Sequence, residues 1–122
     1  MVMKYLLDTN ILIDIHAGKM FLGVKEGHYS YSIISEIELL SWPNIKPLQE
    51  QELRYLLGHF QRVELDASVR DASIHLRRQH RLKLPDAVIA ASALVHDAIL
   101  LTNDQRLLTI PNVRAHSVEI KQ

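Results

Sequence analysis

The chain has 122 residues, of which 48% are hydrophobic, and this composition is typical of a packed globule. The length fits one domain that buries about two-thirds of the surface exposed by the unfolded chain. Fourteen Lys plus Arg balance fourteen Asp plus Glu, so nucleic-acid binding would need a local basic patch. The absence of cysteine excludes disulfides, zinc–thiolate sites and thiol nucleophiles.

The chain shows no sign of export or membrane insertion. No stretch reaches the ~18 apolar residues that a membrane span needs. The N-terminal apolar run is cut by Asp8 and Asp14, and no small-residue cleavage site follows it. We therefore expect a cytoplasmic protein without a membrane partner.

The predicted elements alternate between strands and helices from the N-terminus onward. Residues 2–7 are almost continuously apolar, which indicates a buried strand. Residues 10–16 suit a short helix that Gly18 closes. Residues 29–34 alternate like a second strand, and residues 36–42 form a helix that stops before a proline.

The second half of the chain continues this alternation. Apolar spacing predicts helices over 48–60, 67–80 and 84–97, and short apolar runs predict strands over 62–65, 99–101 and 113–116. Strands that alternate with helices indicate a parallel sheet covered on both faces. We expect residues 1–122 to form a single α/β domain, with three α/β/α layers around a mainly parallel sheet of about five strands.

Four acidic residues lie far apart in the chain but at similar places in these elements. Asp8 and Asp104 directly follow predicted strands, and Glu38 and Asp86 fall in the first turns of predicted helices. Open α/β sheets bind ligands at the carboxyl ends of their strands, so all four acids can converge at one edge.

Each acid, taken singly, also has a purely structural explanation. Ser35 and Glu38 match a capping box, in which Glu38 at the third helical position reaches back to the N-cap amide. Pro85 and Asp86 place proline first in a helix and an acid in its first turn, worth ~0.3–1 kcal/mol against the helix dipole. The two acids that follow strands can cap whatever comes after them.

Capping does not explain why the four acids share one placement. Two like charges ~5 Å apart repel by roughly 3 kcal/mol at an effective dielectric of about 20, so a fold that gathers them needs a counter-ion. Oxygen ligands without nearby histidine or cysteine select Mg²⁺ or Mn²⁺. One or two such ions suit phosphodiester hydrolysis. Hydroxyl and amide side chains able to orient a water or a carboxylate flank two of the acids: Thr9, Asn10, Thr102 and Asn103.

The segments around these acids resemble the PIN domain, specifically the VapC toxins of bacterial and archaeal toxin–antitoxin pairs. In the family's order, the four motifs fall on residues 6–13, 32–40, 84–94 and 101–104. The resemblance implies a metal-dependent endoribonuclease that cleaves RNA with four acids, namely Asp8, Glu38, Asp86 and Asp104. It also implies a PIN-like sheet with strand order 3-2-1-4-5, a homodimer, and a small antitoxin that blocks the site.

Glu36 is a second candidate for the acid of the second motif. It lies two positions from Glu38 and hence nearly opposite to it on a helix. In the family the acid precedes a leucine and lies three residues after a serine or threonine. This pattern selects Glu38 and leaves Glu36 to face solvent. Between the second and third motifs no residue can be matched individually.

A basic run precedes the third motif, made of Arg77, Arg78, His80, Arg81 and Lys83. Its four Lys and Arg residues can contact RNA phosphates and release counterions. A solvated helix end explains the run equally well, because cations are favoured near a helix C-terminus. Both interpretations stay open on the sequence.

Two other functions are compatible with the same acids. The first is phosphotransfer or phosphatase chemistry through an aspartyl-phosphate on Asp8, as in haloacid-dehalogenase-like and receiver domains. Asp8-Thr9-Asn10 departs from the Asp-x-Asp of the former. The second is a non-catalytic interaction module whose acidic pocket binds a basic segment of a partner.

Overall fold

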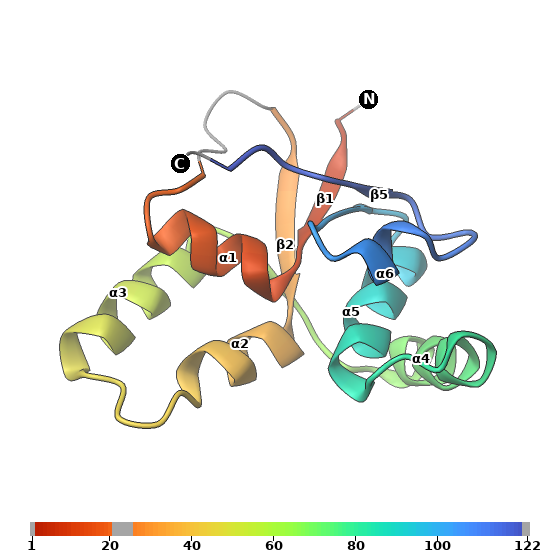
Figure 1. Cartoon of the computed structure of the whole chain (residues 1–122), viewed down its shortest axis with the longest axis horizontal. Coiled ribbons are helices and arrows are strands. Elements are labelled where there is room, and N and C mark those ends of the chain that lie inside the picture. Colours follow the sequence, from red (N-terminus) through yellow and green to blue (C-terminus); the bar gives the residue numbers. More distant parts are fainter. Residues whose placement is uncertain (1, 21–25, 121–122) are drawn as a thin grey trace.

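The computed structural model describes residues 2–20 and 26–120 of the chain, which contain five strands and six helices. The strands are β1 (Lys4–Leu7), β2 (His28–Ser32), β3 (Gln61–Val63), β4 (Ile99–Leu101) and β5 (Ala115–His116). The helices are α1 (Thr9–His16), α2 (Ile33–Leu40), α3 (Pro47–Leu57), α4 (Ala67–His80), α5 (Leu84–Val95) and α6 (Gln105–Leu108). Figure 1 shows their arrangement around the sheet.

The strands form one sheet in the order β3-β2-β1-β4-β5, and every neighbouring pair is parallel. Leu7 pairs with Tyr31 of β2 and with Leu101 of β4, so these three strands end at the same level. The backbone N–H of Asp8 extends the β1–β4 pairing by donating to the Leu101 carbonyl at 3.0 Å. The predicted strand order and parallel sheet are confirmed.

Successive residues of β1 face opposite layers of the molecule. Leu6 is fully buried in a core formed with α4, α5 and α6, whereas Leu7 is fully buried in a second core with α1, α2 and α3. Figure 1 shows α1, α2 and α3 on one side of the sheet and α4, α5 and α6 on the other. A strand buried on both faces has no polar side to alternate with, which explains its continuous apolar run. The predicted three-layer α/β/α fold is confirmed.

The start of α2 differs from the prediction. The helix begins at Ile33, because the buried hydroxyl of Ser32 caps it by accepting a hydrogen bond from the Ile34 N–H at 3.1 Å. The strand predicted over 29–34 therefore ends two residues earlier. The capping box predicted on Ser35 and Glu38 is wrong, since both residues lie inside the helix.

Smaller differences occur elsewhere. Pro85 is the second residue of α5 rather than the first. The four-residue helix α6 was not predicted, and β5 is two residues long instead of the expected four. The left-handed backbone of Gly18 (φ 74°) follows α1 as predicted. Within residues 2–20 and 26–120, no helix has the length and hydrophobicity needed to cross a bilayer.

Candidate active site

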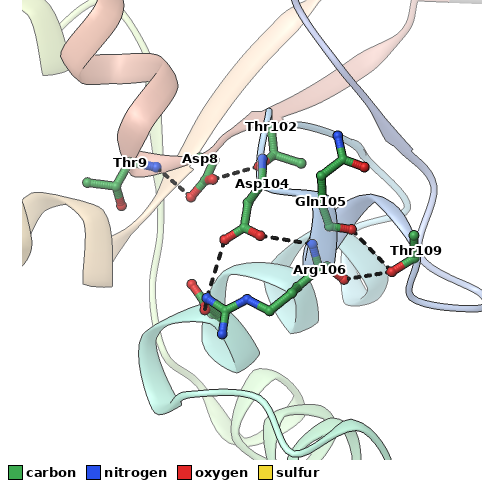
Figure 2. A network of polar contacts seen from close by, with 8 residues as sticks. Asp8, Thr9, Thr102, Asp104, Gln105, Arg106 and Thr109 are labelled. Carbon is green, nitrogen blue, oxygen red and sulfur yellow. Dashed lines mark hydrogen bonds and ion pairs between the residues drawn. The ribbon is translucent and has the colours of Figure 1, made fainter.

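Asp8 occupies the junction between β1 and α1, and its carboxylate is held at both oxygens. The residue is only 5% exposed. Its Oδ1 accepts a hydrogen bond from the Thr9 N–H at 2.8 Å, which caps α1. Its Oδ2 accepts one from the Thr102 hydroxyl at 2.7 Å. Figure 2 shows both contacts.

Thr102 joins the ends of two neighbouring strands. Its fully buried hydroxyl donates to Asp8 and also accepts a hydrogen bond from the Asp104 N–H at 3.0 Å. A valine at this position would have similar shape but could make neither contact. Thr102 therefore fixes the orientation of one acid and the backbone of another.

Asp86 and Asp104 share one guanidinium group. Asp104 caps α6, its Oδ1 accepting from the Arg106 N–H at 2.9 Å. An Nη atom of Arg106 lies 3.5 Å from an oxygen of Asp86 and 3.6 Å from an oxygen of Asp104. Asp86 stands in the first turn of α5 as predicted, and Lys83 at the N-cap makes no side-chain capping bond. Arg106 thus provides the positive charge that these two acids need.

Asp8, Asp86 and Asp104 act on one another electrostatically. Burial raises the pKa of Asp8, the hydrogen bonds from Thr102 and Thr9 lower it, and the charges of the other two acids raise it further. The pKa of Asp86 is raised by burial and then by Asp104, while the cations nearby pull it down. The charges of these three acids thus interact at the carboxyl edge of the sheet, where the sequence analysis expected four acids to converge.

Glu38 joins this region through Thr9. The Thr9 hydroxyl donates to Glu38 Oε1 at 2.7 Å and lies 2.8 Å from the Ser35 hydroxyl. Since a threonine hydroxyl carries one hydrogen, Ser35 is the donor in the second contact. The backbone N–H of Thr9 also donates to Asp8 Oδ1, so one residue connects the two acids. Glu38 serves this contact and not the cap of α2.

The remaining polar candidates lie elsewhere. Asn103 makes two hydrogen bonds with the backbone of Val118, at 3.0 and 2.8 Å, so its amide holds the C-terminal segment and not a carboxylate. Asn10 is exposed on α1, and no side-chain hydrogen bond joins it to another described residue. Neither arrangement follows from sequence neighbourhood, because adjacent side chains on a loop or helix point in different directions.

Glu36 does not face solvent, which corrects the sequence interpretation. Its carboxylate accepts from the Tyr31 hydroxyl at 3.2 Å and pairs with Arg62 at 3.3 Å. Both partners belong to strands β2 and β3, so Glu36 points toward that edge of the sheet. Glu38, on the other side of α2, is the acid linked to Asp8.

The basic run is divided by its contacts. Arg77 Nε donates to the Leu82 carbonyl at 3.1 Å and so helps to close the turn after α4. Arg78, Arg81 and Lys83 are exposed. Arg81 lines a cavity of about 220 Å³ that Arg106 also lines.

A larger cavity of about 500 Å³ lies near the amino ends of β1 and β2, away from the three acids.

The residues at the carboxyl edge fit a divalent cation by their chemistry. Sequence reasoning expected Asp8, Glu38, Asp86 and Asp104 to hold Mg²⁺ or Mn²⁺. As their side chains stand, no three acidic or histidine groups among the described residues are close enough to hold one ion together. However, the guanidinium of Arg106 already bridges Asp86 and Asp104. Asp8 is buried without a cationic partner among the described residues. Partly buried oxygen donors of like charge are the ligands that Mg²⁺ and Mn²⁺ prefer.

Comparison with known proteins identifies the family. The PIN domain profile matches residues 5–113, a span that includes all four acids. A search of curated proteins gave no match. A protein in a toxin–antitoxin complex from Klebsiella pneumoniae is 31% identical, with a TM-score of 0.78 over 92% of this chain and 95% of that one.

Two more distant structures share the fold. One is from VapBC2 of Rickettsia felis bound to a DNA fragment from its promoter, with 21% identity and a TM-score of 0.77 over 96% of this chain and 100% of that one. The other is PAE2754 from Pyrobaculum aerophilum, with 20% identity and a TM-score of 0.70 over 97% and 91%. By its sequence profile, its parallel sheet and its acids at the carboxyl edge, the chain belongs to the PIN domain family.

Proposed function

We propose that the chain is a metal-dependent endoribonuclease and the toxin of a toxin–antitoxin pair. The observation that carries the proposal is the cluster of Asp8, Asp86 and Asp104 at the carboxyl edge of a PIN domain. A buried carboxylate surrounded by like charges costs stability, and a site that binds a cation turns this cost into affinity. The likeness to a protein of a toxin–antitoxin complex supports the toxin role.

In the proposed mechanism the acids have separate tasks. Asp8, Asp86 and Asp104 would hold one or two Mg²⁺ or Mn²⁺ ions. When bound, the metal supplies a Lewis acid for the phosphoryl group and lowers the pKa of a water. Glu38 has one oxygen bound to Thr9, and its second oxygen orients the attacking water and accepts its proton. The water oxygen forms the new bond to phosphorus while the bond to the leaving ribose oxygen breaks.

The aspartyl-phosphate alternative fits the structure less well. A carboxylate that attacks phosphorus needs a free, accessible oxygen. Asp8 is 5% exposed, and each of its oxygens already accepts a hydrogen bond, from Thr9 and from Thr102. A metal ion could still bind, because each carboxylate oxygen keeps a second lone pair beside its hydrogen bond. We therefore retain hydrolysis as the proposed reaction.

We further propose that single-stranded RNA is the substrate and that the chain acts in the cytoplasm. We also propose two protein interfaces: one with a small antitoxin that covers the site, and one with a second copy of the chain in a homodimer. Exposed apolar side chains support the protein interfaces, because lone domains rarely leave many of them in water. On α2, α3 and the loop between them they are Ile37, Trp42, Leu48 and Tyr55. On α4 and α5 they are Ile74, Leu84, Leu94 and Val95.

The test is cleavage of a mixed RNA pool with Mn²⁺, Mg²⁺ or chelator, comparing the intact chain with Asp8→Asn. We expect cleavage only with metal. The variant should lose about 10²–10³-fold in rate, which corresponds to several kcal/mol of charge stabilisation. Asp71→Asn is the matched control, since Asp71 is exposed on α4 and pairs only with Arg70.

Retained cleavage by Asp8→Asn, or cleavage in chelator, would overturn the proposal. Binding of a protein partner that is insensitive to chelator, with no cleavage in any metal, would instead favour an interaction module.

A further inference from the structure

A pocket lined by two arginines adjoins the proposed active site. Its volume is about 220 Å³, and it is lined by His80, Arg81, Leu82, Arg106, Thr109 and Ile110. We refer to it as the Arg81–Arg106 pocket. Two guanidinium groups and an imidazole line it, and none of its lining residues is acidic. The larger cavity at the other edge of the sheet differs, because Glu64 and Asp66 there accompany Lys4 and Arg62.

Arg106 connects this pocket to the acids. One Nη atom of Arg106 lies 3.5 Å from Asp86 and 3.6 Å from Asp104, and the same side chain lines the pocket. Figure 2 shows the side chain extending from α6 toward the turn at the start of α5. A ligand in the pocket would thus lie directly beside the cluster of carboxylates.

Arg81 has a charge that the protein leaves uncompensated. Among the described residues, five arginines pair with acidic side chains, namely Arg54, Arg62, Arg70, Arg106 and Arg114, whereas Arg81, like Arg77 and Arg78, forms no such pair. Its backbone is in the left-handed region (φ 53°), where glycine or asparagine is favoured, and its N–H donates to the Arg77 carbonyl at 3.0 Å. The exposed Arg81 side chain is therefore available to an anionic ligand.

We propose that the Arg81–Arg106 pocket binds a phosphate of single-stranded RNA next to the phosphate that is cleaved. The inference rests on the proposed function and names a binding subsite for its substrate. Guanidinium groups match phosphate oxygens in geometry, and the pocket is the kind of local patch that a chain of zero net charge needs. Of the Lys and Arg residues of the basic run, Arg81 lines the pocket, so the proposal assigns the RNA contact to Arg81.

The test measures binding of a short fluorescein-labelled single-stranded RNA to the intact chain by anisotropy. Chelator is present throughout, so that binding is read without cleavage. Arg81→Asn removes the charge and keeps a residue suited to the left-handed backbone. We expect about fivefold weaker binding at ~0.1 M salt and a salt slope smaller by about 0.7, the loss of one single-strand phosphate contact. Thr109→Glu, which puts a negative charge in the pocket, should weaken binding at least as much.

Arg78→Gln is the matched control, because Arg78 belongs to the same basic run but does not line the pocket. Its affinity should equal that of the unmodified chain. Equal losses in Arg78→Gln and Arg81→Asn, or no RNA binding at all, would overturn the proposal. A third outcome would also overturn it: a polyglutamate peptide binds less well to Arg81→Asn, whereas RNA binds equally well to both chains. The pocket would then serve an acidic protein segment.

The outcome is separable from that of the nuclease proposal. Metal-dependent cleavage by the unmodified chain, together with unchanged RNA affinity in Arg81→Asn, would reject the pocket and keep the nuclease. Arg81-dependent RNA binding without cleavage in any metal would reject the nuclease and keep the pocket.

Discussion

Thr102 is a small residue with a large influence on the proposed metal site. Its hydroxyl donates to Asp8 Oδ2 at 2.7 Å and accepts from the Asp104 N–H at 3.0 Å. It therefore positions two proposed metal ligands. Groups that hydrogen-bond to metal ligands typically affect metal affinity or activity 10–100-fold.

Thr102→Val should therefore lower Mn²⁺ affinity about 10–100-fold, measured by calorimetry on the RNA-free chain. Thr102→Ser keeps the hydroxyl and should restore most of the affinity. If the Thr102→Val and Thr102→Ser variants both bind Mn²⁺ as tightly as the unmodified chain, the hydroxyl has no positioning role.

Single residues also mark where sequence reasoning succeeds and fails. The acids Asp8, Asp86 and Asp104 could be predicted to meet because each follows a strand or opens a helix at one edge of the sheet. Asn103 looked equivalent to Thr102, its neighbour, yet it bonds to Val118. Arg106 was missed, because it lies in the short helix α6, which the sequence pattern did not predict.

Helix α2 shows what local patterns leave undetermined. Both Ser32 and Ser35 are good N-cap residues, and an acid follows the second of them at capping-box spacing. The structure caps the helix at Ser32, and the buried Ser35 instead contacts Thr9 at 2.8 Å. The choice between two caps depends on how α2 packs against α1, a tertiary contact that no sequence window contains.

Ser32→Ala should destabilise the fold by about 1 kcal/mol, because the Ile34 N–H would lose its capping acceptor. Urea unfolding of the chain measures this loss. Ser41→Ala is the control: within residues 2–20 and 26–120, the side chain of this exposed serine at the other end of α2 makes no hydrogen bond, so its loss should cost almost nothing. Equal losses in the two variants would show that the hydroxyl cap of Ser32 does not stabilise α2.

At the scale of the whole molecule, the alternation of strands and helices was enough to predict the class, the layers and the parallel sheet. A strand such as β1 that is apolar on both faces requires helices on both sides. The strand order came from the resemblance to a known family, since hydrophobic patterns do not specify which strands are neighbours. The short helix α6 has too few residues to produce a period.

The stability of the metal-free molecule should fall as pH rises. The folded-state pKa values of Asp8 and Asp86 are raised, so the stability that these groups contribute is fully present below their unfolded value of about 3.9. It is lost as the pH rises through the folded values. Thermal unfolding in chelator at a series of pH values measures this, and Asp8→Asn should flatten the profile and unfold at a higher temperature at neutral pH.

Saturating Mn²⁺ should reverse the trend, because binding requires deprotonated carboxylates and adds about 2.7 kcal/mol at 100 times Kd. A profile with chelator that rises with pH would contradict the electrostatic account of the cluster.

The contact between Asp8 and Thr102 spans 94 positions of sequence. Translation proceeds at about 5–20 residues per second, so the ribosome makes the second residue about 5–20 seconds after the first. During that interval β1 lacks its neighbour β4, and the carboxylate lacks its threonine. A nascent chain therefore cannot complete this edge of the sheet until its last strands have been made.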